Sequence, residues 1–445
     1  MVANRVERGR YLDSVALMRV SRRVSALPGV EAAALMIGTP SNKALLRDAG
    51  LLSADGERAE PNDLVIAVRA ADAAAAVKAA VEMLAEKPAP STERRAGSLR
   101  RALELEPQAN LALISVPGEF AAAEARRALE RGLNAMVFSD NVPIEEEVAL
   151  KRLAKERGLL LMGPDCGTAL IGGAPLAFAN AVPRGDIGIV SASGTGLQEV
   201  SSLIARLGGG VSHGIGVGGR DLDERVGARG MLAAIDMLDA DPGTRTLVLI
   251  SKPPAPRVAQ LVMERVRKSP KRSVVCFLGL ENMTLTTAAE QAMQKNLPAT
   301  PMSAGKVKGK VRGLYCGGTL AAEAALLLGA MAECLDLGDD QYTRGRPHPM
   351  IEPELRNEHI AAALADASVA VLLFDVVLGY GSHADPAGVL VAALKSARKP
   401  VVASVTGTEQ DPQGWSRQVA KLRDAGVHVA SSNAHAAVLA AVAVS

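Results

Sequence analysis

Aromatic side chains are nearly missing from this chain of 445 residues, since Phe, Tyr and Trp together make up 2% of it. This scarcity argues against stacking on nucleic-acid bases, which depends on aromatic side chains. The chain also has little net charge, because it contains 50 basic and 48 acidic residues, with the two signs mixed along the sequence. No basic stripe points to nucleic acid, and no block of like charges points to a disordered tail.

Cysteine is also scarce, and the four residues Cys166, Cys276, Cys316 and Cys334 form no CxxC pair. This spacing is typical of reduced thiols inside a cell. The charged opening MVANRVERGR is unlike a signal peptide, and no apolar run reaches the length of a membrane span. We therefore expect a soluble cytoplasmic protein without membrane or nucleic-acid partners.

Alternating helical and strand patterns predict an α/β protein. Residues 4–86 read as strand, helix, strand, short helix, strand and helix, which favours a ferredoxin-like or ACT-like α+β unit. The segment KPAPSTERRAGS, residues 87–98, reads as a linker. From about residue 110, buried apolar strands alternate with helices, which indicates Rossmann-like or flavodoxin-like parallel sheets covered on both faces.

A weak internal repeat divides the larger part of the chain. IGIVSASGTGLQEV and GLYCGGTLAAEA each run from an apolar strand through small residues into a helix, and similar strands follow both. We predict four domains: an ACT-like domain with its linker at 1–98, a Rossmann domain at 99–184, and two related flavodoxin-type domains at 185–305 and 306–445.

The stretch SASGTG leaves backbone N–H groups uncovered where a helix begins, and a helix N-terminus attracts anions. It is either a tight turn or a cradle for a phosphate or carboxylate, and we favour the cradle. The predicted anion-binding residues here are Ser191, Ala192, Ser193, Gly194, Thr195 and Gly196.

Two further segments carry charge beside small residues. GIGVGGRD ends a strand, so Gly218 and Gly219 would let a ligand approach, and Arg220 offers a planar fork for an anion. Lys252, in SKPP, follows another buried strand and could neutralise an anion held by SASGTG. The alternatives are a flexible surface loop for the first segment and an ion pair between domains for the second.

The second half repeats the small-residue turn in YCGGTL, so Cys316, Gly317, Gly318 and Thr319 are predicted anion-binding residues as well. The thiol of Cys316 fits a small buried residue better than a nucleophile. His383, in a glycine-rich loop, is the candidate general acid or base. The segment at 344–359 holds histidines and glutamates without a metal-ligand spacing, so no metal site is expected.

Several of these motifs resemble those of a known family. VPGEFAAAEARRAL, MGPDCG, IGIVSASGTGLQE and GIGVGG are similar to the α subunit of succinyl-CoA synthetase. RYLDSVALMRVS, MIGTPSNKALL, SKPP, YCGGTL and DDQYTRGRPHPMIEPELR are similar to the FdrA family, a resemblance that extends over essentially the whole chain. FdrA-like proteins are commonly labelled acyl-CoA synthetases. Some are implicated, with partner subunits, in oxamate carbamoyltransferase, which converts oxalurate and phosphate into oxamate and carbamoyl phosphate during allantoin breakdown.

Departures from the synthetase pattern favour the carbamoyltransferase. The synthetases carry a phosphohistidine where this chain reads ENMTLTTAAEQ, and no histidine lies between His213 and His348. Their glutamate partner for that histidine corresponds here to Lys252. The N-terminal CoA-binding loop and the ATP-grasp domain have no counterpart, which argues against CoA binding.

The resemblance therefore implies an oxamate carbamoyltransferase subunit in allantoin and purine catabolism. The residue patterns above supply Lys252, Arg220 and His383 as its catalytic candidates. Its substrates would be phosphate and carbamoyl phosphate, with no cofactor assigned. We expect partner subunits encoded nearby, in a homo- or hetero-oligomer. The alternatives are an acyl-CoA synthetase subunit completed by a nucleotide-binding partner, and a scaffold whose N-terminal unit senses a metabolite.

Overall fold

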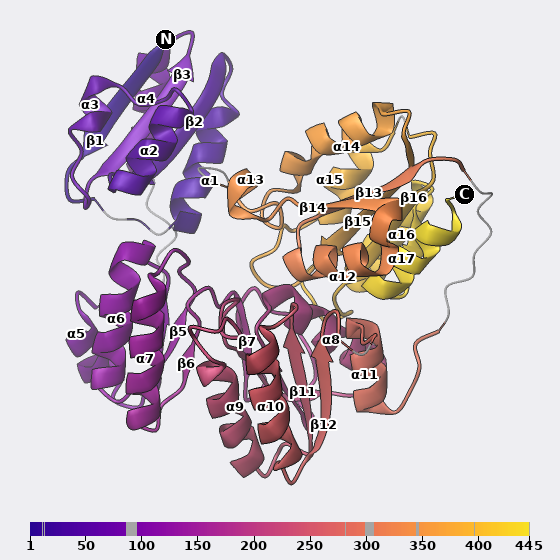
Figure 1. Ribbon diagram of the computed structural model, residues 1–445. Helices are drawn as coiled ribbons and strands as arrows, with labels where there is room; N and C mark the ends of the chain where they lie inside the picture. The colour runs from indigo at the N-terminus through magenta and orange to yellow at the C-terminus, as the bar shows by residue number, and fades with distance from the viewer. Residues whose placement is uncertain are drawn as a thin grey trace. The chain divides into compact units, whose positions relative to one another are not determined.

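The computed structural model describes residues 1–10, 12, 14–85, 96–280, 282–298, 307–343, 347–395 and 397–444. The chain divides into two compact units, Met1–Glu106 with Asp340–Pro347, and Pro107–Asp339 with His348–Ser445. Within the described residues the first unit has one small sheet, and the second has sheets of three, six and five strands (Figure 1). None of the helices in these ranges is long and apolar enough to cross a membrane.

The first unit is built on an antiparallel sheet in the order β1-β3-β2. Successive side chains of the central strand β3 point to opposite faces of the sheet, and both sets are buried. Leu64, Ile66 and Val68 enter one apolar cluster, while Val65 and Ala67 enter another. The elements are β1 (Val2–Glu7), α1 (Ser14–Ser25), β2 (Val30–Ile37), α2 (Pro40–Asp48), α3 (Ala54–Glu57), β3 (Leu64–Ala70), α4 (Ala73–Ala85), α5 (Leu99–Leu105) and α13 (Asp340–Thr343).

The order of elements in this unit confirms the predicted α+β pattern. A strand inserted antiparallel between two parallel strands that a helix connects is the split βαβ arrangement of ferredoxin-like folds. The predicted linker at 87–98 lies mostly outside the described residues, since only 96–98 are described.

The second unit begins with a parallel sheet in the order β4-β5-β6. A β-hairpin follows, and it pairs with β10 of the next sheet. The positive φ angles of Gly172 and Gly173 make the tight turn of this hairpin. The elements are β4 (Leu111–Ile114), α6 (Gly118–Glu130), β5 (Asn134–Val137), α7 (Ile144–Glu156), β6 (Leu161–Met162), β7 (Thr168–Ile171) and β8 (Ala174–Ala177).

The six-stranded sheet has the order β12-β11-β9-β10-β7-β8, and its first four strands are parallel. Every residue of β9 is buried, as expected for a strand covered on both faces. The remaining elements are β9 (Ile187–Ser191), α8 (Gly194–Arg206), β10 (Val211–Gly216), α9 (Arg229–Ala240), β11 (Thr246–Ser251), α10 (Pro256–Arg267), β12 (Arg272–Phe277) and α11 (Leu285–Met293).

The five-stranded sheet is parallel throughout, in the order β14-β13-β15-β16-β17. Strands β16, β15, β13 and β14 repeat the order of β12, β11, β9 and β10, as the internal repeat predicts. The elements are β13 (Lys310–Tyr315), α12 (Gly318–Leu328), the 3-10 turn Gly329–Met331, β14 (Ala332–Asp336), the 3-10 turn Pro353–Arg356, α14 (Asn357–Ala365), β15 (Val369–Val377), α15 (Pro386–Ala393), β16 (Val401–Thr406), α16 (Trp415–Asp424), β17 (His428–Ala430) and α17 (Asn433–Val442).

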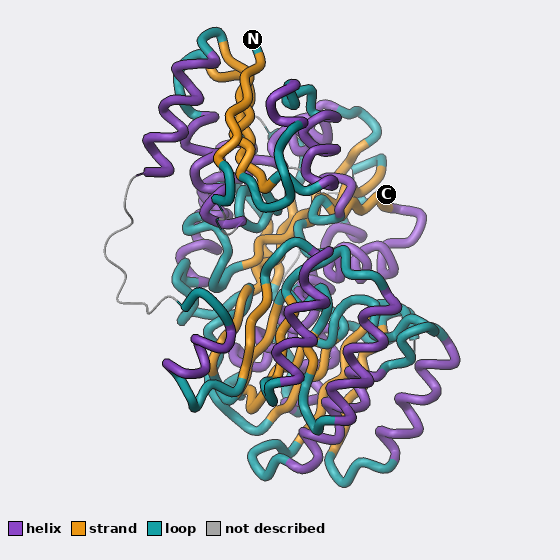
Figure 2. Tube along the Cα trace, turned by 90° about the vertical axis from the view of Figure 1, so that its left-hand side faces the viewer, coloured by secondary structure: helices purple, strands orange, loops and turns teal. Residues whose placement is uncertain are grey.

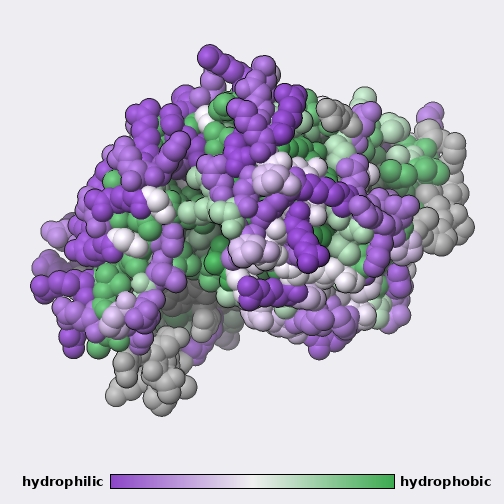
Figure 3. Space-filling view, turned by 90° about the horizontal axis from the view of Figure 1, so that it is seen from below, coloured by the Kyte–Doolittle hydropathy of each residue, from purple (hydrophilic) through white to green (hydrophobic). Residues whose placement is uncertain are grey.

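One apolar core joins the five- and six-stranded sheets. Leu197 and Val200 of α8 belong to the same buried cluster as Leu320 and Ala324 of α12. Helices α8, α11, α12 and α17 contact one another between the two sheets, and Figure 2 shows helices flanking the strands. The parallel α/β architecture confirms the predicted fold class. The surface mixes both characters, since Figure 3 shows hydrophilic side chains interspersed with hydrophobic areas on the face it presents.

Candidate functional site

The SASGTG turn lies at the start of α8, and its hydroxyl groups shape it. Ser193 caps the helix by accepting the N–H of Gly196 at 2.9 Å. The Ser191 hydroxyl donates to the Ser193 carbonyl at 2.7 Å and accepts the Ser193 N–H at 3.1 Å. The N–H groups of Gly194 and Thr195 belong to the first helical turn, which offers them no acceptor. The backbone of this turn is therefore available to an anion.

The YCGGTL turn at the start of α12 holds an anion that belongs to the protein itself. The N–H groups of Cys316 and Gly317 donate to the two oxygens of Asp375, each at 2.8 Å. Asp375 is fully buried at the end of β15 and pairs with the buried Arg356 at 3.0 Å. A protein carboxylate thus occupies the donors that the sequence assigned to a ligand at Cys316 and Gly317.

Cys316 is unsuited to nucleophilic chemistry in this setting. Burial raises the pKa of its thiol, and the neighbouring carboxylate of Asp375 raises that pKa further. The Sγ atom lies 3.5 Å from Asp375 Oδ2. These features agree with the structural interpretation of this cysteine.

The two helix N-termini meet. The Ser193 hydroxyl donates to the Thr319 hydroxyl at 2.6 Å, so the first turns of α8 and α12 are in contact. Thr195 Cγ2 lies 3.1 Å from the position that a Cβ on Gly317 would take. Each helix start carries partial positive charge, so an anion placed between them would be stabilised by both.

Lys252 lies beside this junction. Its Nζ atom is 3.1 Å from the point that a Cβ on Gly318 would occupy. The side chain is exposed, and within the described part of the chain it makes no hydrogen bond or ion pair. The structure thus brings together Ser193, Thr195, Gly317, Gly318, Thr319 and Lys252, all of them predicted from the sequence.

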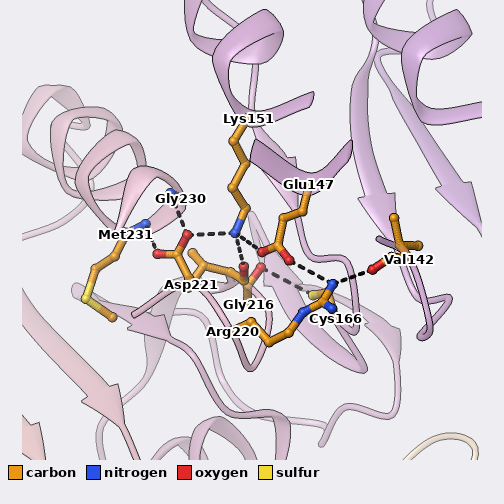
Figure 4. Close-up of polar contacts among 10 residues, drawn as sticks. Val142, Glu147, Lys151, Cys166, Gly216, Arg220, Asp221, Gly230 and Met231 are labelled. Atoms are coloured by element: carbon orange, nitrogen blue, oxygen red, sulfur yellow. Dashed lines mark hydrogen bonds and ion pairs between the residues drawn. The ribbon is translucent and has the colours of Figure 1, made fainter. Parts of the chain in front are cut away.

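Arg220 belongs to a different cluster, shown in Figure 4. Its guanidinium pairs with Glu147 at 2.9 Å and donates to the Val142 carbonyl at 2.8 Å. Lys151, fully enclosed, pairs with Glu147 at 2.8 Å and with Asp221 at 2.6 Å. Two charges of each sign therefore hold α7 against the loop after β10, and the contacts of Arg220 are with these elements rather than with SASGTG.

Gly218 and Gly219 pack against the turn at 163–165. A Cβ on Gly218 would lie 2.2 Å from the Pro164 carbonyl oxygen, and one on Gly219 would lie 3.1 Å from an oxygen of Asp165. Gly218 also has φ +90°, a conformation that other residues rarely adopt. Close backbone packing therefore accounts for glycine at 218.

His383 is held within its own loop. Its Nδ1 atom accepts the Asp385 N–H at 3.0 Å, and its backbone N–H donates to the Met350 carbonyl at 2.9 Å. None of these contacts joins it to the junction of α8 and α12.

Two residues near the junction were missed by sequence reasoning. Asp336, at the end of β14, places Oδ2 2.2 Å from the position of a Cβ on Gly318. His348 places Nε2 2.5 Å from the corresponding position on Gly338, close to the Cys316 carbonyl. Burial lowers the pKa of His348 to about 4, so its imidazole is neutral at neutral pH. The position of Asp336 at the end of a strand was the available signal. His348 lies in the segment 344–359, which was considered only as a metal site.

Comparisons with known proteins show which family the chain resembles. Residues 314–443 match the CoA-ligase family model, and residues 1–100 match a family described as the AllF heavy metal-associated domain. The uncharacterized protein YahF of Escherichia coli K12 is 40% identical, over 97% of this chain and 96% of that protein.

Among solved structures, the chain is similar to the dinucleotide forming acetyl-coenzyme A synthetase 1 of Ca. Korarchaeum cryptofilum, in complex with phosphate and ADP. The identity is 17% over 75% of this chain and 81% of that one, with a TM-score of 0.33. PH0766 of Pyrococcus horikoshii is 19% identical over 75% and 83% of the two chains, with a TM-score of 0.32.

The heavy-metal description does not fit the residues present. The first 100 residues contain no cysteine and no histidine, the thiolate and imidazole ligands that such metals prefer. Among the described residues of the whole chain, no cluster of three or more His, Cys, Asp and Glu side chains could hold a metal ion. The N-terminal unit thus matches that family without metal-ligating residues of these two types.

Proposed function

This chain belongs to the FdrA/AllF family of succinyl-CoA synthetase-like proteins, and from that premise we propose that it is a subunit of an oxamate carbamoyltransferase in allantoin catabolism. The reaction takes oxalurate and phosphate to oxamate and carbamoyl phosphate. The observation that carries the proposal is the meeting of two helix N-termini at the Ser193–Thr319 hydrogen bond. Beside it lies the ammonium of Lys252, which has no hydrogen bond or ion pair with the residues that the structure describes.

The chemistry requires binding and orientation more than a covalent intermediate. A phosphate oxygen attacks the carbamoyl carbon of oxalurate, the bond from that carbon to the oxamate nitrogen breaks, and the nitrogen takes up a proton. The N–H groups that open α8 and α12 hold the phosphate, and Lys252 stabilises the negative charge that develops on the carbonyl oxygen. Holding both reactants in one orientation supplies much of the rate.

The shortage of nucleophiles near the junction fits direct transfer. Cys316 is buried and protonated, and no histidine lies between His213 and His348 in the sequence. The synthetases need such a histidine for phosphoryl transfer, so its loss removes that step and leaves an anion site.

Partner subunits are part of the proposal. Large apolar side chains stay exposed at and near the C-terminal end of α12, namely Leu326, Leu327 and Met331. Exposed apolar groups that lie close together are typical of surfaces that bind other proteins. We expect the isolated chain to be folded but to have little or no activity.

An acyl-CoA ligase subunit is the second candidate function. The match of residues 314–443 to the CoA-ligase family favours it, and His348 offers an imidazole near the Cys316 carbonyl. A ligase would need a nucleotide-binding partner and would form a phosphoenzyme, whereas a carbamoyltransferase would not.

Co-expression with the products of neighbouring genes, followed by assay of oxalurate cleavage, tests the proposal. We expect cleavage that requires phosphate and releases oxamate and carbamoyl phosphate in equal amounts. An assembled complex that ignores oxalurate but joins an acid to CoA with a nucleotide would establish the ligase instead. Turnover of oxalurate by the purified single chain would contradict the need for partners.

A further inference from the structure

Two side chains of opposite charge flank Gly318 without pairing. A Cβ on Gly318 would lie 2.2 Å from Asp336 Oδ2 and 3.1 Å from Lys252 Nζ. Asp336 uses Oδ1 to accept the Gly338 N–H at 3.0 Å. Within the described residues, Oδ2 accepts no hydrogen bond and the Lys252 ammonium donates none. One acceptor and one donor therefore face the same point at the start of α12.

The surroundings hold the carboxylate of Asp336 in place. Asp336 is partly buried, and its burial raises the pKa of the carboxyl, while the charge of Lys252 opposes that rise. The Gly338 N–H fixes the plane of the carboxylate through Oδ1. Polar groups without protein partners gain the most from a ligand that completes their hydrogen bonds.

We propose that Asp336 and Lys252 together recognise the carbamoyl group: Asp336 Oδ2 accepts an N–H of its amide, and Lys252 donates to its carbonyl oxygen. This inference rests on the proposed function. It assigns to Asp336 and Lys252 the discrimination between carbamoyl phosphate and other acyl phosphates. The carbamoyl group is planar and carries its donor and its acceptor on one carbon, so two protein groups on either side of Gly318 can meet both. An acetyl group has a methyl in place of the donor and leaves Asp336 Oδ2 unpaired.

Gly318 is part of the same proposed binding site. A side chain at this position would displace these groups, since its Cβ would lie closer to both than ordinary van der Waals contact allows. Glycine at this position thus keeps a side chain from separating Asp336 and Lys252 at the helix start.

The test is calorimetric titration of the complex assembled with its partner subunits, using carbamoyl phosphate, acetyl phosphate and inorganic phosphate. We expect the wild type to prefer carbamoyl phosphate over acetyl phosphate by about tenfold or more, because a site built for a hydrogen bond rejects an analogue that lacks it. In Asp336→Asn, the Gly338 N–H keeps the amide oxygen at Oδ1, so an NH₂ group faces the carbamoyl NH₂. The preference should fall to about threefold or less. Loss of the negative charge beside the anion site should strengthen the binding of all three ligands alike, so the ratio between the two acyl phosphates is the readout.

Asp424→Asn is the matched control, because Asp424 is exposed at the end of α16 and its loss changes the net charge equally. Its preference should equal that of the wild type. Equal binding of the two acyl phosphates by the wild type, or an undiminished preference in Asp336→Asn, would overturn the recognition role while phosphate binding persists. Failure of the wild type to bind any of the three ligands would overturn the proposed function and this inference with it.

Discussion

Glu199 and Glu323 occupy equivalent positions on α8 and α12, and each accepts the first N–H of a helix from the other half of the core. Glu199 accepts the N–H of Asn433 at the start of α17 at 3.0 Å. Glu323 accepts the N–H of Leu285 at the start of α11 at 2.6 Å. Both side chains are buried, so these reciprocal caps fix how the two related sheets pack and how the two helix N-termini meet.

Glu323 should make stability depend on pH. Burial raises its pKa to about 7 from an ordinary value of 4.5. A carboxyl whose pKa is higher in the folded state stabilises the fold below pH 4.5, and that contribution is lost as the pH rises through 7. The shift corresponds to about 3 kcal/mol.

Glu323→Gln removes this titration, so the free energy of unfolding should fall less between pH 5 and 7 than in the wild type, as urea denaturation measures it. The control is Glu358→Gln, which removes an exposed carboxylate. Identical pH profiles for Glu323→Gln and the wild type would contradict this account.

Asp375→Ala should be strongly destabilising. It leaves the guanidinium of Arg356 buried without a charge partner and frees the N–H groups of Cys316 and Gly317. Breaking a buried ion pair costs about 3–5 kcal/mol. Urea denaturation measures the loss, and added formate should restore part of it, because a small carboxylate fits the vacated place. A loss below about 1 kcal/mol would mean that the internal carboxylate does not organise this turn.

Incubation with labelled ATP should give no phosphoenzyme. The chain lacks a histidine in the ENMTLTTAAEQ segment, and Lys252 replaces the acidic partner that the resemblance places there. The measurement is acid-labile label retained on the chain, with a succinyl-CoA synthetase α subunit as positive control. Stable label that disappears in His348→Asn would instead make His348 the phosphoryl carrier and support the ligase.

The fold could be predicted where the sequence pattern is local. Apolar strands that end in small residues and run into helices predicted β9–α8 and β13–α12, and the observed strand orders repeat accordingly. The hairpin β7–β8 was not predicted, because TALIGGAPLA is short and its pairing with β10 is a tertiary contact. In the N-terminal unit the strand and helix signals over residues 4–86 predicted the main elements in order, and within that range only the short helix α3 was not predicted.

The candidate site could be predicted only in part, because several of its contacts are tertiary. The backbone turns, Lys252 and the glycines carry local signals, whereas the occupation of the second turn by Asp375 depends on a residue 59 positions away. Arg220 appeared free in the sequence, because its partner Glu147 lies on α7, far from the loop after β10 along the chain. The strand end marked Asp336 only weakly, and its proximity to Gly318 and Lys252 is a tertiary contact that the sequence does not show.

Substitutions in the SASGTG turn differ in how cleanly they test it. A Cβ at Gly196 would meet Ser193 Oγ at 2.9 Å and Ile250 at 3.0 Å, so bulk there would disturb the fold. At Gly194 the nearest atom is Thr168 Oγ1 at 3.1 Å, which makes Gly194→Val the milder change. Lys252 is exposed and makes no hydrogen bond or ion pair with the described residues, so its removal breaks no such contact there. It does remove the positive charge that opposes the raised pKa of Asp336.

The affinity of the assembled complex for carbamoyl phosphate, measured by calorimetric titration in wild type, Lys252→Ala and Gly194→Val, tests the central claim most directly. Lys252→Ala should weaken binding by about 1.5–3 kcal/mol, the range for a hydrogen bond to a charged group. Lys252→Arg should restore only part of it, because a guanidinium fork does not replace a compact ammonium. Lys268→Ala, which removes an exposed lysine from the end of α10, should bind as the wild type does. Unchanged affinity in both Lys252→Ala and Gly194→Val, with folding intact, would contradict an anion site at the junction of α8 and α12.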